Sequence, residues 1–441
     1  MAREVKDLLS VADGGTVDAP DVVAIQRRAK RLTLVRGGAV AGVAVLLVAA
    51  AVGVTGGLVQ SPMPLIGEGP ELPPAEPTEA DEMDAPETGP PLWTTQLDPE
   101  VFGDFGSRAQ LVSDGQRLFV TSGHGDDPSV VVALELATGD QVWHTDLEWA
   151  AHLHATTGEL LFASSQPQGV VALDVVTGEQ VWEHGLPEGY AAISAAVSEQ
   201  TLYLVAGAGG EGDTSPPRVH ALSLDQGTLQ WSSTLAPGTD PQWSPPTIVE
   251  DRLLVAATPA NPQVEVGNHV HALRLADGSE AWSVDLGGNQ GFTSRATAVS
   301  HGLLHVSVRG VGVVTLDIAR GAISHTIDDA SLFDTRPGVL YVAGHGEPTV
   351  VRAVDPRTGE PLDQQPTWEL DDDWFEVEVH PQGSELLLPA TSTLSAVDPD
   401  TGTLAWRHTH ETPTYEILVL DGLLITANQP AQLVATRLPA D

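Results

Sequence analysis

One short phrase returns along the chain and constrains its fold more than any other feature. It reads VVALELATGDQVWH at 131–144, VVALDVVTGEQVWE at 170–183 and SAVDPDTGTLAWRH at 395–408. Its turn glycines are Gly139, Gly178, Gly227, Gly278, Gly321, Gly359 and Gly402. Successive glycines lie 39, 49, 51, 43, 38 and 43 residues apart. A period of about 40–50 residues with strand-like content predicts a β-propeller built from four-stranded blades.

Each phrase has the chemistry of a β-hairpin. An apolar strand leads into a polar turn whose glycine can adopt a positive φ, and a second strand follows. Six residues before the glycines stand Ala133, Ala172, Ala221, Ala272, Thr315, Ala353 and Ala396. Four residues after them stand Trp143, Trp182, Trp231, Trp282, His325, Asp363 and Trp406. Because His325 and Asp363 depart from the tryptophan pattern, we expect looser packing at those two positions.

A further strand precedes each hairpin, and there are eight such strands for only seven complete hairpins. They read RLFVTSG, ELLFASS, TLYLVAG, RLLVAAT, GLLHVSV, VLYVAG, ELLLPA and LLITAN. The eighth hairpin is divided between the two ends of the repeat region. Residues 88–97 (TGPPLWTTQL) carry the glycine and tryptophan, and residues 432–438 (QLVATRL) carry the preceding strand. Pairing of these two segments would close a ring of eight blades without exposed sheet edges.

The phrase resembles the quinoprotein (PQQ-type) repeat, whose units carry A-x-D-x-x-T-G-x-x-x-W. AVDPDTGTLAW at 396–406 and ALDVVTGEQVW at 172–182 fit this pattern, and the resemblance extends over residues 88–441. In that family the repeated tryptophan packs between neighbouring blades. The resemblance therefore implies an all-β, eight-bladed propeller in which the repeat is structural.

The resembled family has two branches with different functions. One branch contains alcohol and sugar dehydrogenases that bind pyrroloquinoline quinone with calcium; these are generally longer, and many place a vicinal disulfide against the cofactor. The other contains compact propellers that bind proteins, including the lipoprotein of the outer-membrane protein assembly machinery. This chain has 441 residues and no cysteine. Both properties favour the compact, non-catalytic branch without a cofactor, and a quinoprotein dehydrogenase is the alternative.

The charge of the chain excludes some partners. Residues 60–441 contain 13 arginines, no lysine and 55 acidic residues. Such a body is repelled by phosphate backbones and by anionic lipid headgroups, so we expect no nucleic-acid binding. The absence of cysteine also excludes disulfides and thiolate metal sites.

The amino end predicts a membrane anchor. Residues 37–59 are apolar almost throughout, which is enough to cross a bilayer as one helix. The basic cluster RRAKRLTLVR precedes them and resembles the lead-in of many actinobacterial single-pass proteins; it places residues 1–36 in the cytoplasm. Residues 60–87, with eight acids and seven prolines, are expected to be a disordered linker. A cleaved signal peptide is the alternative, but it normally has a shorter apolar core nearer the chain start.

One segment stands out as a candidate partner contact. ELDDDWFEVEVHP at 369–381 places three acids next to two aromatic residues: Asp371, Asp372, Asp373, Trp374 and Phe375. The run lacks the alternating oxygen ligands and glycine turn of a calcium loop. It is either a solvated connector before an inner strand or a contact patch with aromatic anchors inside an acidic rim.

Other motifs carry weaker signals. Three H-x-H pairs place two rings on one face of a strand, as metal ligands can lie: His152/His154, His269/His271 and His408/His410. No third ligand is evident, so we expect no metal. VAGAGGEGDTSPPR at 205–218 is rich in glycine but does not precede a helix, so a phosphate-binding role is not expected.

Together these observations predict a single-pass membrane protein whose propeller lies outside the cell membrane. We expect the propeller to act as a non-catalytic scaffold or sensor that binds an envelope protein. A small ligand in the central channel remains an alternative reading of the same fold.

Overall fold

The computed structural model describes the repeat region and not the amino-terminal segments. The described residues are 87–102, 110–121, 129–148, 151–165, 169–208, 215–235, 239–241, 246–259, 267–288, 291–345, 348–362, 365–370, 378–380, 385–389, 393–409, 414–420, 422–428 and 431–439. The cytoplasmic segment and the anchor helix predicted over residues 1–59 lie outside these ranges, as does the predicted linker apart from Glu87. Among the described helices, none is long and apolar enough to cross a membrane.

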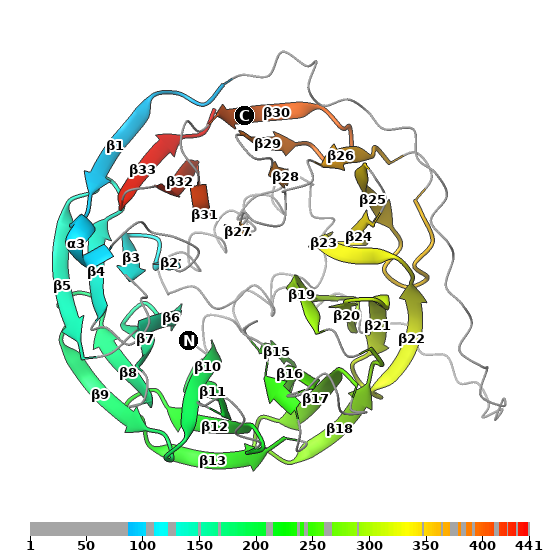
Figure 1. Ribbon diagram of the computed structural model, residues 1–441, viewed down its shortest axis with the longest axis horizontal. Helices are drawn as coiled ribbons and strands as arrows, with labels where there is room; N and C mark the ends of the chain where they lie inside the picture. The colour runs from blue at the N-terminus through cyan, green and yellow to red at the C-terminus, as the bar shows by residue number, and fades with distance from the viewer. Residues whose placement is uncertain are drawn as a thin grey trace, which may run out of the picture. The chain divides into compact units, whose positions relative to one another are not determined.

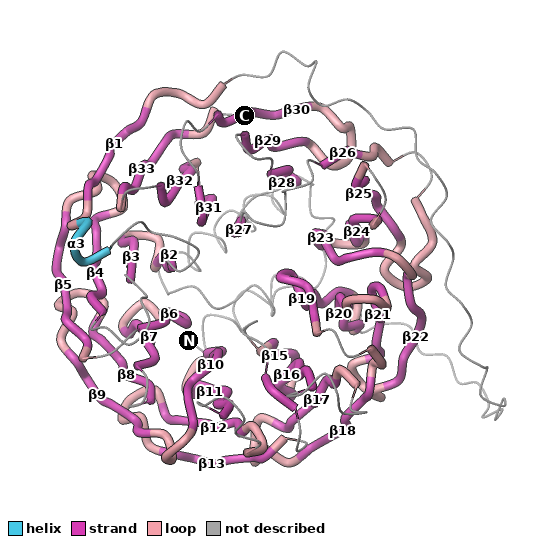
Figure 2. Tube along the Cα trace, in the orientation of Figure 1, coloured by secondary structure: helices cyan, strands magenta, loops and turns pink. Residues whose placement is uncertain are grey.

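The described strands form eight sheets that follow one another around a common axis, as Figures 1 and 2 show. Blade 1 contains β2 (Gln110–Ser113), β3 (Arg117–Thr121), β4 (Ser129–Glu135) and β5 (Gln141–Leu147). Blade 2 contains β6 (Ala151–Thr156), β7 (Leu160–Ser165), β8 (Gly169–Asp174) and β9 (Gln180–Gly185). Blade 3 contains β10 (Tyr190–Val197), β11 (Thr201–Ala208), β12 (Arg218–Ser223) and β13 (Leu229–Thr234). Blade 4 contains β14 (Thr239–Pro241), β15 (Thr247–Val249), β16 (Arg252–Pro259), β17 (His269–Arg274) and β18 (Glu280–Asp285).

The second half of the chain completes the ring. Blade 5 contains β19 (Phe292–Ser300), β20 (Leu303–Val308), β21 (Gly312–Asp317) and β22 (Ala322–Ile327). Blade 6 contains β23 (Ala330–Arg336), β24 (Val339–Gly344), β25 (Thr349–Val354) and β26 (Trp368–Leu370). Blade 7 contains β28 (Leu386–Pro389), β29 (Thr393–Val397) and β30 (Leu404–Thr409). Blade 8 contains β31 (Thr414–Leu420), β32 (Leu423–Asn428), β33 (Gln432–Arg437) and β1 (Pro91–Gln96); the helix α3 (Pro99–Phe102) follows β1. The all-β, eight-bladed propeller predicted from the repeat is therefore confirmed.

The two ends of the repeat region close the ring as predicted. Strand β1 pairs antiparallel with β33, with Thr94 opposite Val434. The residues before β1 also bind the neighbouring blade, because the Thr88 amide donates to the Arg407 carbonyl at 2.9 Å and the Thr88 hydroxyl lies 2.8 Å from His408 Nδ1. The start of the described chain thus joins blade 8 to blade 7 (Figure 1).

One inner strand departs from the regular blade pattern. The segment before blade 7 contributes β27 (Glu378–His380), which pairs in parallel with β31 of blade 8. The described part of blade 7 therefore has three strands, and blade 8 gains a fifth. Innermost strands of adjacent blades run in the same direction and lie closest near the axis, so a short strand can bond to its neighbour's edge.

The core lies between neighbouring sheets and is built from one repeated row of side chains. Across blades 1–4, 7 and 8 an alanine stands opposite a large residue of the strand before it and the tryptophan of the outermost strand, as in Phe162, Ala172 and Trp182. The alanine leaves room for the two rings to meet, and the centroids of Phe162 and Trp182 are 5.8 Å apart. Aromatic contacts of this kind add about 0.5–1.5 kcal/mol to the burial of each ring.

The turn glycine explains the other half of the repeat. Gly178, at φ +73°, lies directly under the Trp143 indole of the preceding blade, and a Cβ placed there would be 2.6 Å from that ring. The same tryptophan donates its indole N–H to the Val175 carbonyl at 3.0 Å. Equivalent bonds join Trp93 to Leu136, Trp182 to Leu224, Trp231 to Leu275 and Trp282 to Ile318. The expected packing of the repeat tryptophan between neighbouring blades is confirmed.

Blade 6 corrects one assignment made from spacing alone. Counting four residues from Gly359 points to Asp363, which lies outside the described residues, whereas β26 begins only at Trp368, which pairs with Val351 of β25. Pro366 occupies the tryptophan's place against the next turn, since a Cβ on Gly402 would lie 2.8 Å from the proline ring. Extra residues between the glycine and β26 shift the outer strand, and a fixed spacing cannot detect such a shift.

Candidate interaction surface

The outward face of the outermost strands carries most of the exposed large apolar side chains. On β1, β5 and β9 the tryptophan points inward and the residue before it points to solvent, so Val142 and Val181 are 45% and 50% exposed. Leu92 on β1 and Leu229 on β13 are similarly exposed, at 46% and 50%. Val176, in the turn of blade 2, is 56% exposed. Besides these, the exposed large apolar residues among those described are Val101 in α3 and Ile323 on β22 of blade 5.

These outer strands form one continuous surface rather than isolated edges. The Thr95 hydroxyl of β1 donates to the Gly139 carbonyl in the turn before β5, at 2.7 Å. The Thr145 hydroxyl of β5 donates to the Gly178 carbonyl in the turn before β9, at 2.6 Å. Figure 1 shows β1, β5, β9 and β13 following one another along the circumference. We call the outward faces of these four strands, with turns 135–140, 174–179 and 223–228, the belt.

Charge is distributed unevenly around the ring. Residues 129–235 contain thirteen acidic residues and a single basic one, Arg218. The guanidinium of Arg218 lies 5.2 Å from the centre of the Tyr190 ring, so it is engaged within blade 3. By contrast, residues 291–362 of blades 5 and 6 contain seven acidic and six basic residues. The belt therefore lies in a strongly acidic part of the propeller.

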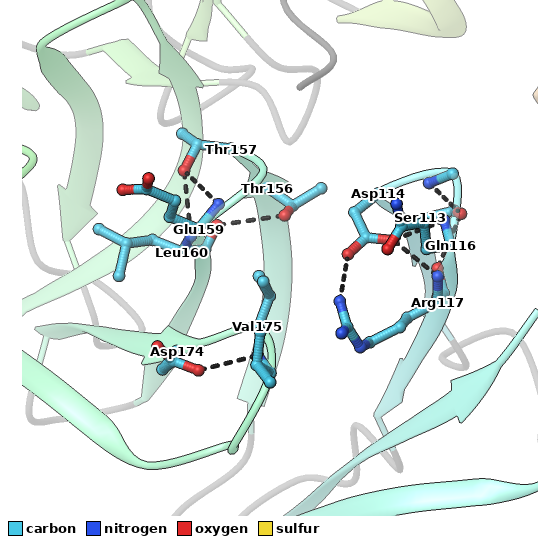
Figure 3. Close-up of polar contacts among 12 residues, drawn as sticks. Ser113, Asp114, Gln116, Arg117, Thr156, Thr157, Glu159, Leu160, Asp174 and Val175 are labelled. Atoms are coloured by element: carbon cyan, nitrogen blue, oxygen red, sulfur yellow. Dashed lines mark hydrogen bonds and ion pairs between the residues drawn. The ribbon is translucent and has the colours of Figure 1, made fainter. Parts of the chain in front are cut away.

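Carboxylates in the turns also hold the backbone in place. Asp174 accepts hydrogen bonds from the backbone amides of Val176 and Thr177, each at 2.8 Å, and these bonds lower its pKa. In the neighbouring turn Asp114 binds two backbone amides and the Arg117 guanidinium, as the close-up in Figure 3 shows. Asp174 is thus negative at neutral pH, and the carboxylates of both Asp174 and Asp114 are partly committed to turn structure.

Blade 5 replaces the apolar row with a buried polar one. His305, Thr315 and His325 stand opposite one another across the blade, where blades 1–4, 7 and 8 place apolar, alanine and tryptophan residues. The Ser300 hydroxyl lies 2.8 Å from His305 Nε2, and the Thr315 hydroxyl lies 3.0 Å from Nδ1. Burial, reinforced by the nearby His325 and His301, lowers the pKa of His305 to about 4. His305 is therefore neutral at physiological pH and serves as a hydrogen-bonded core residue.

The H-x-H pairs occupy structural positions where the structure describes them. The His269 and His271 rings stack at 5.9 Å, and His271 Nδ1 lies 3.2 Å from a carboxylate oxygen of Glu280. Burial lowers the pKa of His154 to about 3, so that ring too is neutral. The described residues contain no group of three or more His, Asp or Glu side chains that could hold a metal ion. His410 lies outside the described residues.

The predicted contact patch cannot be placed. All five of its members, Asp371, Asp372, Asp373, Trp374 and Phe375, lie outside the described residues, between β26 and β27. The belt, by contrast, was not recognised from the sequence. Its signals were the apolar residue before three of the tryptophans and the loss of basic residues between 129 and 235, and both are visible in the sequence.

A hollow lies at the seam where the chain ends replace the eighth turn. It has a volume of about 510 Å³ and is lined by Glu87, Gly89, Pro90, Leu92, Arg437, Leu438 and Pro439. Gly89 has no tryptophan above it, in contrast to the turn glycine of blade 1. The hollow is wide and has few polar groups, so we assign it no ligand.

A quinone cofactor with calcium does not fit the residues that the structure describes. Calcium requires six to eight oxygen ligands, usually including several carboxylates, and the described residues form no such cluster. Of the seven tryptophans that the structure describes, five donate their indole N–H to backbone carbonyls of the next blade and serve the packing between blades.

Comparison with known proteins identifies the family. The sequence matches the family described as "Outer membrane protein assembly factor BamB" over residues 82–213 and 215–378, which is more than half of the chain. This protein is therefore a member of the PQQ-like repeat propeller family. No curated protein matches the sequence.

Solved structures with the same fold have different functions. BamB from Moraxella catarrhalis is 14% identical, with a TM-score of 0.55 over 79% of this chain and 99% of that one. The quinohemoprotein alcohol dehydrogenase ADHIIG from Pseudomonas putida HK5 is 13% identical, with a TM-score of 0.55 over 80% and 77%. The computationally designed Ika8 protein is 13% identical, with a TM-score of 0.56 over 79% and 100%. At these identities the likeness defines the fold alone.

Proposed function

We propose that this protein is a membrane-anchored propeller that acts outside the cell membrane as a non-catalytic scaffold or sensor for an envelope protein. The proposal rests on a difference between the repeated packing positions of the blades and their variable exposed positions. The repeated tryptophans, glycines and alanines are used between blades, whereas the exposed outer faces differ from blade to blade. Such a molecule keeps its frame constant and can vary its surface for recognition.

The apolar segment 37–59 and the basic cluster before it support the proposed anchor and its orientation. The extracytoplasmic position is tested by attaching a reporter at residue 441 that is active on only one side of the membrane. We expect activity on the outside. A reporter active only in the cytoplasm would contradict the proposed orientation.

The scaffold proposal is tested by cross-linking the full-length protein in cells and identifying attached proteins by mass spectrometry. Residues 60–441 contain no lysine, so amine-reactive reagents are unsuitable and photo-activated or carboxylate-directed chemistry is required. We expect one reproducible envelope partner. Recovery of the protein alone, under conditions that capture a known envelope complex, would count against the scaffold.

The alternative function is that of a quinoprotein dehydrogenase, favoured by the fold similarity to ADHIIG. Purified protein incubated with pyrroloquinoline quinone, calcium and a panel of alcohols and sugars would then reduce an electron-accepting dye. We expect no substrate-dependent reduction. Dye reduction that requires both the substrate and the quinone would establish the enzyme and refute the non-catalytic proposal.

A further inference from the structure

The apolar residues on the belt are not required by the fold. The internal repeat provides the comparison, because the outer strands of blades 1–5, 7 and 8 share the position immediately before the tryptophan or, in blade 5, before His325. That position holds Leu92, Val142, Val181, Gln230, Ala281, Ser324 and Ala405. The fold therefore accepts a polar or small side chain at this point in blades 3, 4, 5 and 7. The large apolar side chains in blades 8, 1 and 2 remain 45–50% exposed and gain little from burial within the chain.

The charge around these residues limits which kind of molecule can bind to the belt. Glu135, Asp140, Glu179 and Asp225 are exposed in the turns of the belt, and Glu183 is exposed on β9 itself. The only arginine between 129 and 235 is engaged with Tyr190. An anionic membrane, a nucleic acid or the belt of a second copy would be repelled. A surface with apolar side chains inside an acidic rim is complementary to a segment that has an apolar face flanked by Arg or Lys.

We infer that the belt is the docking surface for a cationic, amphipathic segment of another protein. The apolar face of that segment covers Val142, Val176 and Val181, and its basic side chains lie against the turn acids. This inference rests on the proposed scaffold function and names the surface and the partner chemistry for it. The chain's own residues 21–36 are also basic and amphipathic, but the expected topology places them across the membrane.

Site-specific photo-cross-linking in the full-length protein in cells tests the inference. A photoreactive phenylalanine analogue is placed at Val176, and a matched probe is placed at Ala319. Ala319 is the equivalent exposed turn residue of blade 5, two positions before Gly321 as Val176 is before Gly178. A third probe at Trp374 samples the segment singled out in the sequence. We expect a partner from position 176 and not from 319, with the attached peptide rich in apolar residues and in Arg or Lys.

Truncation of the belt supplies the second measurement. The double variant V142A/V181A carries the residue that blades 4 and 7 have at the same position, so its fold is expected to be retained. Loss of two apolar contacts should lower the cross-linking yield from position 176 by about tenfold. The control is I323A, which removes an exposed apolar side chain of blade 5, 40% exposed and outside the belt. It should leave the yield unchanged.

The results of these cross-linking experiments distinguish a failure of the belt inference from a failure of the scaffold proposal. A partner captured from position 374 but not from 176 would refute the belt and leave the scaffold standing. Failure to capture a partner from any position would refute both. Equal cross-linking yields from positions 176 and 319 would refute the inference, and so would an acidic attached peptide. Attachment to residues 21–36 of the same chain would refute both the inference and the expected topology.

Discussion

At the residue scale, the repeated glycine and tryptophan form one unit that spans two blades. The glycine has a positive φ and also lies against the indole of the preceding blade, so two requirements coincide at one position. Either requirement alone would favour glycine. Together they explain why the glycine recurs in all seven complete phrases, including those in which tryptophan is replaced by His325 or Pro366.

The two requirements can be separated by substitution. Gly422 has nearly the same φ as Gly178, +72° against +73°, but no atom lies within 4 Å of a Cβ placed there. We expect G422A to cost about 1–2 kcal/mol from the left-handed backbone alone. G178A should cost at least about 2 kcal/mol more, because the Trp143 ring must move and its contacts are lost. Urea unfolding of both variants measures the difference; equal costs would show that the ring contact is unimportant.

The polar row of blade 5 should make stability sensitive to acid. The pKa of His305 is about 4 in the folded chain and near 6.5 when unfolded. The unfolded chain therefore binds a proton first, and the stabilising contribution present above pH 6.5 is lost as the pH falls towards 4. For one such group the loss is about 2–3 kcal/mol.

A matched variant tests this assignment. Blade 4 has Leu254, Ala272 and Trp282 in the same row, so H305L/T315A/H325W converts blade 5 to its pattern. We expect the free energy of unfolding of this variant to fall less steeply between pH 6.5 and 4 than that of the native chain. An unchanged slope would show that other groups control the acid response.

At the element scale, adjacent blades are joined by inner strands as well as by the outer turns. Glu416 on β31 is buried and accepts a hydrogen bond from the Leu111 amide of blade 1 at 2.7 Å. Gln110 on β2 performs the same task for the Leu153 amide of blade 2 at 2.6 Å. An acceptor at this point thus ties successive inner strands together.

The comparison of these two residues yields a prediction. E416Q keeps an oxygen acceptor like that of Gln110 and should change the free energy of unfolding only slightly. E416A removes the acceptor and leaves a buried amide unbonded, which costs about 1–3 kcal/mol. Denaturant unfolding distinguishes the variants. A loss for E416Q as large as that for E416A would show that the charge, rather than the acceptor, is required.

The closing strand pair gives the second prediction at this scale. Thr94 and Val434 are directly opposite on β1 and β33, and the chain has no native cysteine to compete. A disulfide in T94C/V434C should raise the free energy of unfolding by about 2–4 kcal/mol, because it joins the two ends of the ring. The reduced variant is the control. Equal stability of the oxidised and reduced forms would indicate that β1 does not limit unfolding.

At the scale of the whole molecule, the acidic propeller should be sensitive to salt. The residues after 59 contain 55 acidic and 13 basic side chains, and this excess opposes the compact state. Raising the ionic strength from 10 to 150 mM shortens the screening length from about 30 to 8 Å. We therefore expect the unfolding temperature of the full chain in neutral detergent to rise over this range. Sorbitol at equal osmolality is the control, and a fall in salt would contradict the argument.

Most of the propeller could be predicted from the sequence because a hairpin is a local structure. The strand, the turn glycine and the second strand of each phrase lie within about a dozen residues, so the local sequence pattern predicts the hairpin. The count of eight second strands against seven hairpins also determined how the ring closes. All eight strands and the pairing of β1 with β33 are present in the structure.

Only the tertiary structure decided what depends on contact between blades. Three features depend on residues that are distant in sequence. They are the pairing of β27 with blade 8, the contact of Pro366 with Gly402, and the polar row that replaces three side chains in blade 5. Such contacts depend on side-chain volume and on strand register, which one inserted residue can shift. The belt likewise became visible only when the outer strands were placed end to end, because its members come from four different blades.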